Sequence, residues 1–331
     1  MNKGIAIAGN ILTDNVKMIS AYPEKGMLVT IENESLAVGG AVPNTAMDIK
    51  NIDNGIKISV HGRVGNDEKG KYVLSQMSSI GIDVSAVKIS NTAPTAYSDV
   101  MTVSGSGERT FFHNRGANKE FCIDDIEIDK LDCDIFHIGY LMLLDFFDTL
   151  DEQNSTPMAK LLKSIREKGI KTSIDLVSET SGNFHKVVSA ALPYCDFVII
   201  NEIEAGNIVG ISPRDEAGNL LKDNVRLIME KLMDYGINDK VIIHCPEMGF
   251  CLDKQGKYTI VPSVKLKKGF IKGSVGAGDA FCAGALYSIY KGLEDNEMLK
   301  FANLVAINCL SQPDSVSGVC SAENLYKVLE K

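Results

Sequence analysis

The sequence has no apolar run near the roughly 18 to 20 residues that a membrane-spanning helix needs, so we expect no association with a membrane. It also lacks a dense tract of lysine or arginine. The 34 basic residues are outnumbered by 43 acidic ones, which gives a formal net charge of −9. Binding to nucleic acid requires a basic surface, and we therefore expect no nucleic-acid partner.

A signal-peptide core is also missing, because the apolar stretch at 4–9 is short and contains two glycines. We interpret it as the first strand of a cytoplasmic protein. The eight cysteines never form a C-x-x-C pair, and most lie inside apolar runs. This pattern favours buried, reduced thiols over a zinc site or a disulfide framework.

The chain does have 331 residues, of which 45% are hydrophobic and 23% charged. That length supplies a sizeable core and allows one large α/β domain or two smaller ones. Helices that end at a glycine and precede a buried strand recur along it. The helical patterns cover 67–80, 157–168 and 219–235, and strands follow the last two at 171–176 and 241–243.

Such units predict a mostly parallel sheet covered by helices, because parallel neighbours need long crossovers. In sheets of this kind, ligands bind beyond the carboxyl ends of the strands. The polar residues that follow predicted strands are Asp175, Asn201, Glu204 and His244. We therefore expect these side chains to surround a binding site.

Two stretches break the alternation of helix and strand. Residues 97–103 and 109–113 have the pattern of a β-hairpin, and residues 26–32 that of a further exposed strand. We interpret them as a small β layer beside the main sheet. This layer either moves as a lid over a substrate or is a fixed decoration of the edge.

One segment imitates a phosphate-binding loop. Residues 65–71 satisfy the pattern G-x-x-x-x-G-K, but Tyr72 follows where a hydroxyl that binds Mg²⁺ is needed. Asp67 and Glu68 would also repel phosphate. We interpret the segment as the turn that opens the helix at 67–80.

The most informative segment is the glycine-rich turn at 273–279, which precedes a helix at 280–290 that is apolar almost all round. The first amides of a helix lack intrahelical partners and lie at the positive end of its dipole. Gly276, Ala277 and Gly278 are therefore predicted to bind an anion. Asp279 beside an anion suits a base that deprotonates an acceptor hydroxyl in phosphoryl transfer. The alternative is a helix start that Asp279 merely caps.

A second group consists of Gly39, Gly40 and Asn44, with Asp14 after the first strand. Glycines let a ligand approach the backbone, and Asp14 and Asn44 can exchange hydrogen bonds with hydroxyl groups. The alternative is that Asp14 is a turn residue and Asn44 a helix-start residue.

Taken together, these segments resemble the PfkB-type carbohydrate kinases, the ribokinase-like family, over nearly the whole chain. The family's motif D-T-x-G-A-G-D is matched by Gly276, Ala277, Gly278 and Asp279, with Ser274 in place of the threonine. The other matches are Gly39, Gly40 and Asn44 to G-G-x-x-x-N, residues 62–67 to G-x-V-G-x-D, Asn201 and Glu204 to N-x-x-E, and residues 116–118 to G-A-N.

The resemblance implies a single kinase domain over 1–331. Its fold would be a three-layer α/β/α arrangement with a mostly parallel central sheet and a β lid from about 13–36 and 94–116. The activity would be ATP-dependent transfer of the γ-phosphoryl group to a hydroxyl of a sugar or sugar derivative. Asp279 would be the catalytic base, and the amides of Gly276, Ala277 and Gly278 the anion hole. The acceptor would be held by Asp14, Gly39, Gly40, Asn44 and Asn118.

The resemblance also implies an Mg²⁺ ion organised by Asn201 and Glu204, through water. The ATP would contact these two residues together with His244, Ser274, Gly276 and Gly278. Its base would lie beside the helix at 301–310 and the loop at 312–318.

Two departures from the family pattern bear on cofactors. Gly273 stands where the motif opens with an aspartate that supports a monovalent-cation site in several relatives, which puts dependence on such a cation in doubt. Pro246 replaces a glycine near the triphosphate and removes an amide donor. We expect altered phosphate contacts there, either with a proton-dependent contribution from His244 or with His244 only packed locally.

The hypothesis from the sequence is thus an ATP- and Mg²⁺-dependent carbohydrate kinase. The alternatives are a nucleoside kinase of the same fold and a nucleotide-binding regulator without turnover. The exposed β layer also suggests a homodimer formed through the lid. The chain carries no readable signal for which hydroxyl of which acceptor is phosphorylated.

Overall fold

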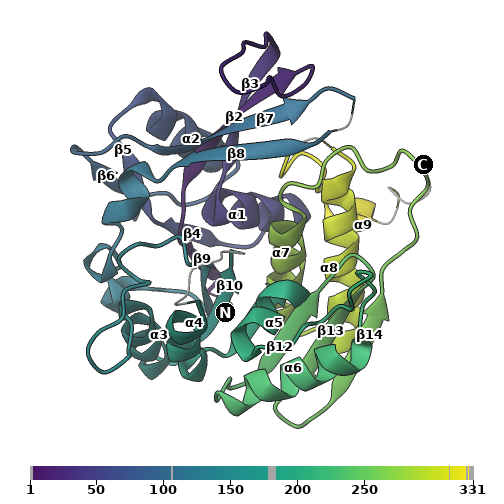
Figure 1. Ribbon diagram of the computed structural model, residues 1–331. Coiled ribbons are helices and arrows are strands. Elements are labelled where there is room, and N and C mark those ends of the chain that lie inside the picture. The colour runs from purple at the N-terminus through teal and green to yellow at the C-terminus, as the bar shows by residue number, and fades with distance from the viewer. Residues whose placement is uncertain (1–2, 106, 178–183, 313, 326, 328–331) are drawn as a thin grey trace.

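The computed structural model describes residues 3–105, 107–177, 184–312, 314–325 and 327 (Figure 1). Its main sheet has eight strands in the order β14-β13-β12-β11-β10-β9-β1-β4. The strands are β1 (Ile5–Ala8), β4 (Ile58–His61), β9 (Ile135–Leu141), β10 (Lys171–Leu176), β11 (Phe197–Asn201), β12 (Lys240–His244), β13 (Met248–Asp253) and β14 (Tyr258–Pro262). The strands β12, β11, β10, β9, β1 and β4 run parallel to one another. Strands β13 and β14 add an antiparallel hairpin at one edge.

Helices cover both faces of the main sheet. They are α1 (Ala41–Ile52), α2 (Glu68–Ser79), α3 (Pro157–Glu167), α4 (Phe184–Ala191), α5 (Glu202–Val209), α6 (Lys222–Asp234), α7 (Ala277–Tyr290), α8 (Asp295–Leu310) and the short α9 (Ala322–Leu325). Because successive strand residues point to opposite faces, Ile5 and Ile7 pack in one core with α1, α2, α7 and α8. Ala6 and Ala8 pack in the other with α3 to α6. The three-layer fold with a mostly parallel sheet is confirmed.

The predicted helices form close to their expected bounds. Thr156 caps α3, since its Oγ1 accepts a hydrogen bond from the Ala159 amide at 3.1 Å. Helix α6, by contrast, begins at Lys222 and not at residue 219. The reason is a local turn, in which Arg214 and Leu220 pair in an isolated β-bridge that holds the preceding residues out of the helix.

A second sheet of four strands lies at the top of Figure 1, apart from the main sheet. Its order is β3-β2-β7-β8, formed by β2 (Leu12–Ile19), β3 (Ile31–Gly39), β7 (Ala96–Val103) and β8 (Arg109–Asn114). The predicted hairpin is present as β7 and β8. The prediction of a strand at 26–32 is wrong, because β3 begins only at Ile31. Met27 and Leu28 are 70% and 88% exposed in the preceding loop, so their apolar pattern imitates a strand without a pairing partner.

The carboxyl ends of β9 and β10 are irregular. The pairing register shifts between them, so that Gly139 and Tyr140 stand opposite the single residue Asp175. Tyr140 has a φ of 62°, a left-handed conformation that is unusual for a residue with a side chain. Asp175 stabilises it, because its Oδ1 accepts a hydrogen bond from the Tyr140 amide at 2.6 Å. A bulge of this kind redirects a side chain, here that of Tyr140.

Asp67 links the first turn of α2 to the base of the second sheet. Its Oδ1 accepts hydrogen bonds from the Gly70 amide at 2.8 Å and the Thr95 hydroxyl at 2.6 Å, and its Oδ2 accepts one from the Thr95 amide at 2.8 Å. Thr95 is fully buried and immediately precedes β7. The segment that imitates a phosphate loop is therefore a helix-opening turn, as predicted.

We expect Asp67→Ala to lower the free energy of unfolding by about 2 to 3 kcal/mol, because it removes a helix cap and leaves the buried Thr95 amide without its acceptor. Asp67→Asn is the matched control, since it retains an oxygen that can cap α2, and it should cost less. Urea unfolding of the three proteins measures the difference. Equal stability of wild type and Asp67→Ala would contradict the structural role of this carboxylate.

Candidate active site

Helix α7 begins at a glycine in the left-handed conformation. Gly276 is its N-cap residue with a φ of 80°, and a Cβ atom there would lie 2.5 Å from the Cβ of Ser315, so a side chain does not fit. Ala277, Gly278 and Asp279 follow in the first turn, where amides lack intrahelical partners and the helix dipole is positive. The alternative prediction, in which Asp279 only caps the start of this helix, is therefore wrong, because the N-cap residue is Gly276.

Asp279 is buried, and two side chains from distant segments donate hydrogen bonds to the same oxygen. Its Oδ2 accepts from Asn44 Nδ2 at 2.8 Å and from the Tyr140 hydroxyl at 2.9 Å. Burial raises the pKa of Asp279 to about 7, the charge of Asp175 adds to this, and the two donors oppose it. A carboxylate with a pKa near neutrality can take up and release a proton, which is what a general base requires.

Asn44 is held in place by Ser315, whose hydroxyl donates to Asn44 Oδ1 at 2.9 Å. With that oxygen engaged, the amide nitrogen faces Asp279. Asn44 lies in the first turn of α1, which follows Gly40 with a φ of 92°. A Cβ atom on Gly40 would lie 2.5 Å from the carbonyl oxygen of Asn10, so the glycine permits the close approach that brings α1 to the site.

Tyr140 is the residue at this site that sequence reasoning missed. Its hydroxyl reaches Asp279 only because of the bulge at the end of β9. The available signal was its position after residues 135–139, a stretch that is apolar except for His137 and whose end would place Tyr140 among the other polar residues.

A cavity of about 510 Å³ lies beside Asp279 at the carboxyl ends of the parallel strands. All four polar residues predicted at strand ends line it, namely Asp175, Asn201, Glu204 and His244. Tyr140 and, from the second sheet, Phe111 also line it. The second sheet therefore contributes to the wall of the cavity.

Asp14 lies on β2 close to Gly39 of β3, since a Cβ atom on Gly39 would be 2.4 Å from Asp14 Oδ2. It is a strand residue and not a turn residue. Burial raises the pKa of Asp14 to about 6, while a hydrogen bond with Ser98 and the charge of Arg109 lower it. The negative charge of Asp14 is also the smallest of the causes that raise the pKa of Asp279.

Asn118 lies in the short 3₁₀-helix Gly116–Glu120 and is buried. Its Oδ1 accepts a hydrogen bond from the Ile11 amide at 3.3 Å, which ties it to the link between β1 and β2. Its Nδ2 has no hydrogen-bond partner among the described residues. Asn118 thus has a structural role and an amide donor that this role does not use.

Asn201 and Glu204 form a capping box at the start of α5. Asn201 Oδ1 accepts from the Glu204 amide at 2.8 Å, and Glu204 Oε2 accepts from the Asn201 amide at 3.1 Å. The N-x-x-E motif therefore fixes two side-chain oxygens at the end of β11. Oxygen donors of this kind, one of them a carboxylate, fit the ligand preference of Mg²⁺.

His244 is the last residue of β12, and its ring centroid lies 4.8 Å from that of Phe281. Burial lowers the pKa of His244 to about 4, although the charge of Asp175 opposes this effect. Burial thus favours the neutral imidazole. The contact with Phe281 is the local packing that one alternative expected. A contact of His244 with phosphate stays a prediction.

A second cavity of about 550 Å³ adjoins the first, and the two share Asn201, His244, Ser274 and Gly278 in their linings. The rest of its lining consists of Pro246, residues that follow β14, and side chains of α7 and α8, among them Phe281 and Ile307. This is the space beside the helix at 301–310 where the base of a nucleotide was expected.

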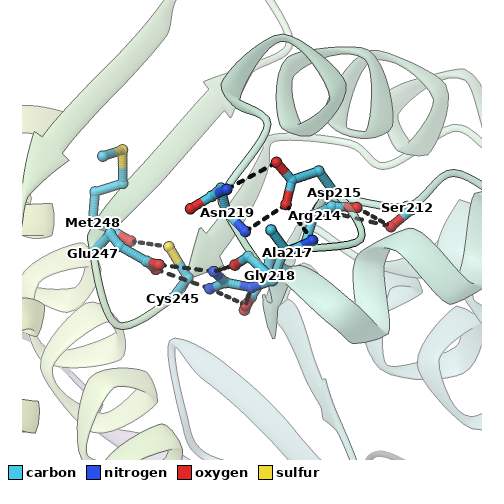
Figure 2. Close-up of polar contacts among 10 residues, drawn as sticks. Ser212, Arg214, Asp215, Ala217, Gly218, Asn219, Cys245, Glu247 and Met248 are labelled. Carbon is cyan, nitrogen blue, oxygen red and sulfur yellow. Dashed lines mark hydrogen bonds and ion pairs between the residues drawn. The ribbon is translucent and has the colours of Figure 1, made fainter.

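Arg214 connects the two segments that border the second cavity (Figure 2). Its guanidinium donates two hydrogen bonds to Glu247 at 2.7 and 2.9 Å and also bonds Glu202 Oε1 at 2.6 and 2.9 Å. Glu202 begins α5, and Glu247 lies in the turn between β12 and β13 that contains Pro246. The bond to Arg214 lowers the pKa of Glu247 to about 2. This ion-pair cluster could not be predicted from the sequence, because its members are 12 and 33 residues apart along the chain.

Two adjoining cavities meet at the amino end of α7, and Asp279, a carboxylate of near-neutral pKa, lines the first of them. This arrangement suits an enzyme that transfers an anionic group between two small molecules. The comparisons with known proteins agree with this class. The model of the pfkB family of carbohydrate kinases matches residues 7–319. This chain belongs to that family.

Among curated relatives, an uncharacterized sugar kinase of Archaeoglobus fulgidus is 24% identical over 80% of this chain and 96% of its own length. Ribokinase of Haemophilus influenzae is 22% identical over 100% of this chain and 99% of its own. Among solved structures, Arabidopsis thaliana ribokinase complexed with ribose and ATP superposes with a TM-score of 0.80 at 18% identity and full coverage of both chains. A nucleoside kinase of Methanocaldococcus jannaschii gives 0.72 at 18% identity, over 99% of this chain and 98% of its own.

The protein is accordingly an ATP-dependent carbohydrate kinase, which moves the γ-phosphoryl group to a hydroxyl of a sugar or sugar derivative. The family expected from the sequence motifs is confirmed, as is the ribokinase-like fold. Within the part of the chain that the structure describes, no helix is long and apolar enough to cross a bilayer.

Because Arg214 holds the pKa of Glu247 below its ordinary value of 4.5, the ion pair stabilises the fold above that pH and loses its effect as the pH falls toward about 2. Glu247→Gln should therefore lower the free energy of unfolding at pH 7, by less than about 1 kcal/mol since the carboxylate is partly exposed. The difference from wild type should shrink through the same pH range. Urea unfolding at a series of pH values measures it, and Glu216→Gln in the neighbouring loop is the control that should change nothing. A difference that stays constant with pH would contradict the ion pair.

Proposed function

We propose that Asp279 is the catalytic base, that the first amides of α7 hold the migrating phosphoryl group, and that the first cavity holds the sugar while the second holds ATP. The junction of the two cavities at Ser274 and Gly278 supports this division. It puts the anion-binding end of α7 between the two substrates. The observation that carries the proposal is the buried Asp279 carboxylate, which lines the first cavity and directly follows Gly278 at this junction.

The hydrogen bonds of Asp279 indicate which of its oxygens reacts. Asn44 and Tyr140 both donate to Oδ2. Oδ1 is then the atom that accepts the proton of the acceptor hydroxyl. The two donors also fix the plane of the carboxylate, so that deprotonation and attack on the γ-phosphorus occur from one orientation.

Gly276, Ala277 and Gly278 are proposed as the anion hole. Their amides lie where the helix dipole favours negative charge, and none of the three residues has a side chain longer than a methyl group. Such donors stabilise the charge on the equatorial oxygens of the transferred group, and most of the rate enhancement comes from this and from positioning.

Asn201 and Glu204 are the residues proposed to hold Mg²⁺. Because the capping box already engages Asn201 Oδ1 and Glu204 Oε2, contact through water molecules suits them better than direct ligation. When bound, the ion would neutralise charge on the phosphates. A monovalent cation is not part of the proposal, since Gly273 brings no carboxylate to this turn.

The lining of the first cavity favours a neutral, hydroxyl-rich acceptor. Asp175, Glu204 and Asp279 line it, and none of its described lining residues is lysine or arginine. An anionic acceptor would be repelled, whereas hydroxyl groups can donate to these carboxylates. The residues proposed to position the sugar remain Asp14, Gly39, Gly40, Asn44 and Asn118, with the unused Nδ2 of Asn118 as a donor to it. None of the five lines the first cavity itself, so the proposal requires the sugar to extend beyond that cavity toward β2 and α1.

The second sheet, with neighbouring residues at about 13–36 and 94–116, is proposed to act as a lid, because Phe111 reaches the cavity from β8. Its outer residues Leu28, Ile31, Leu36 and Phe112 are exposed apolar side chains. They support a homodimer formed through the lid. We place the protein in the cytoplasm, where ATP is available and its eight free thiols stay reduced.

The main test is Asp279→Asn, measured as ADP release over a panel of neutral sugars, sugar acids and nucleosides. Turnover on the best sugar should fall about 10² to 10⁴-fold, because the amide cannot take the proton, with little change in ATP affinity. Asp129→Asn, an exposed carboxylate with 91% of its side chain accessible, is the matched control and should be fully active. Near-normal turnover of Asp279→Asn would remove this residue from the role of base, and a preference for nucleosides would replace the sugar assignment.

The pH profile tests Tyr140 as a positioning residue. The rate should fall as the pH drops through the pKa of Asp279, about 7, because the protonated acid cannot act as a base. Tyr140→Phe removes a donor that lowers this pKa, so the acid limb should move to higher pH. Tyr72→Phe, whose hydroxyl bonds the Leu36 carbonyl at the surface, is the control and should keep the wild-type profile. An unshifted acid limb in Tyr140→Phe would show that the hydroxyl does not act on the base.

A further inference from the structure

Three side chains that can ligate a metal converge in the floor of the first cavity, and the kinase mechanism does not use them together. They are His137 of β9, Asp175 of β10 and Cys282 of α7, all buried. The Nε2 atom of His137 lies 3.7 Å from Cys282 Sγ and 3.8 Å from Asp175 Oδ2. All three ligand atoms lie within 4.8 Å of one another.

These separations are close to those around a bound transition metal. Tetrahedral zinc has bonds of about 2.0 to 2.3 Å to nitrogen, oxygen and sulfur, which places neighbouring ligand atoms about 3.3 to 3.8 Å apart. Small side-chain movements would therefore suffice for His137 Nε2, Asp175 Oδ2 and Cys282 Sγ to coordinate one ion. The donor set of imidazole, thiolate and carboxylate suits a borderline-soft divalent ion such as Zn²⁺ and not Mg²⁺.

Two of the three side chains also have a polar partner at the atom that would not contact the metal, as metal ligands usually do. His137 Nδ1 lies 3.0 Å from the Ser173 hydroxyl, and when Nδ1 carries the proton and donates it to this hydroxyl, Nε2 is free to ligate. Asp175 Oδ1 accepts the Tyr140 amide at 2.6 Å, which leaves Oδ2 facing the histidine. The partners of these two ligands therefore come from β10 and from the end of β9, which also build the active site.

The cluster is accessible to an ion from solution. Asp175 and Cys282 line the first cavity, while His137 lies behind them. Three protein ligands leave the fourth tetrahedral position to a water molecule on the cavity side, the arrangement of an open and not of a closed structural zinc site.

We propose that His137, Asp175 and Cys282 form a binding site for one divalent transition-metal ion of the zinc type, separate from the Mg²⁺ residues Asn201 and Glu204. On binding, the Cys282 thiol loses its proton to solvent, and the metal–sulfur bond takes the place of the S–H bond. The site does not depend on the roles proposed above for Asp279 or ATP, and its test uses binding and not turnover.

The test is titration of the metal-free, full-length chain with Co²⁺, a spectroscopic substitute for Zn²⁺, in excess Mg²⁺ to occupy sites that prefer hard ions. Wild type should bind one Co²⁺ and develop thiolate-to-cobalt charge-transfer absorption, which added Zn²⁺ abolishes. Cys282→Ala should lose this absorption. Cys251→Ala, which removes another buried free thiol outside the cluster, is the matched control and should retain it.

Ser173→Ala gives a second measurement that leaves all three ligands in place. Loss of the hydroxyl behind His137 should weaken Co²⁺ binding about 10 to 100-fold while the charge-transfer absorption persists at saturation. Circular dichroism of the metal-free variants establishes that they are folded. The proposal is overturned if folded wild type shows no charge-transfer absorption with Co²⁺ in large excess, if Cys282→Ala retains it, or if Ser173→Ala binds Co²⁺ as tightly as wild type.

Discussion

The site depends on one constraint, which is that a carboxylate must be buried at the amino end of α7 without losing its ability to ionise. Burial and the nearby charge of Asp175 favour the protonated form of Asp279, whereas Asn44 and Tyr140 favour the ionised form. Neither donor is local to α7, since one comes from α1 and the other from the end of β9. Three elements of the fold, α1, α7 and the end of β9, must therefore meet correctly before this single carboxylate is poised near neutral pH.

Much of this arrangement could be predicted from the sequence, because its signals are local. Pro157 after a capping threonine marked α3, and the glycine-rich turn before an apolar stretch marked α7. The polar residues after predicted strands indeed line one cavity, since a parallel sheet collects its carboxyl strand ends at one edge. Motifs that extend over a few residues identified the family for the same reason.

The remaining features could not be predicted, because they depend on register and on long-range pairing. Tyr140 reaches Asp279 through a shift in register between β9 and β10 that no residue pattern announces. Arg214 meets Glu202 and Glu247 across loops whose paths follow from the finished fold. The apolar residues at 26–32 misled the prediction in the opposite way, since exposed side chains in a loop carried the alternation of a strand.

The left-handed backbone at residue 140 also limits how this enzyme can evolve. Glycine or asparagine would adopt that conformation with less strain, but neither carries a hydroxyl that extends as far as the phenol does. Phenylalanine keeps the ring and loses the donor. Each single replacement thus introduces backbone strain or loses the hydrogen bond to Asp279. A lineage that exchanged this tyrosine without either cost would first have to remodel the strand end.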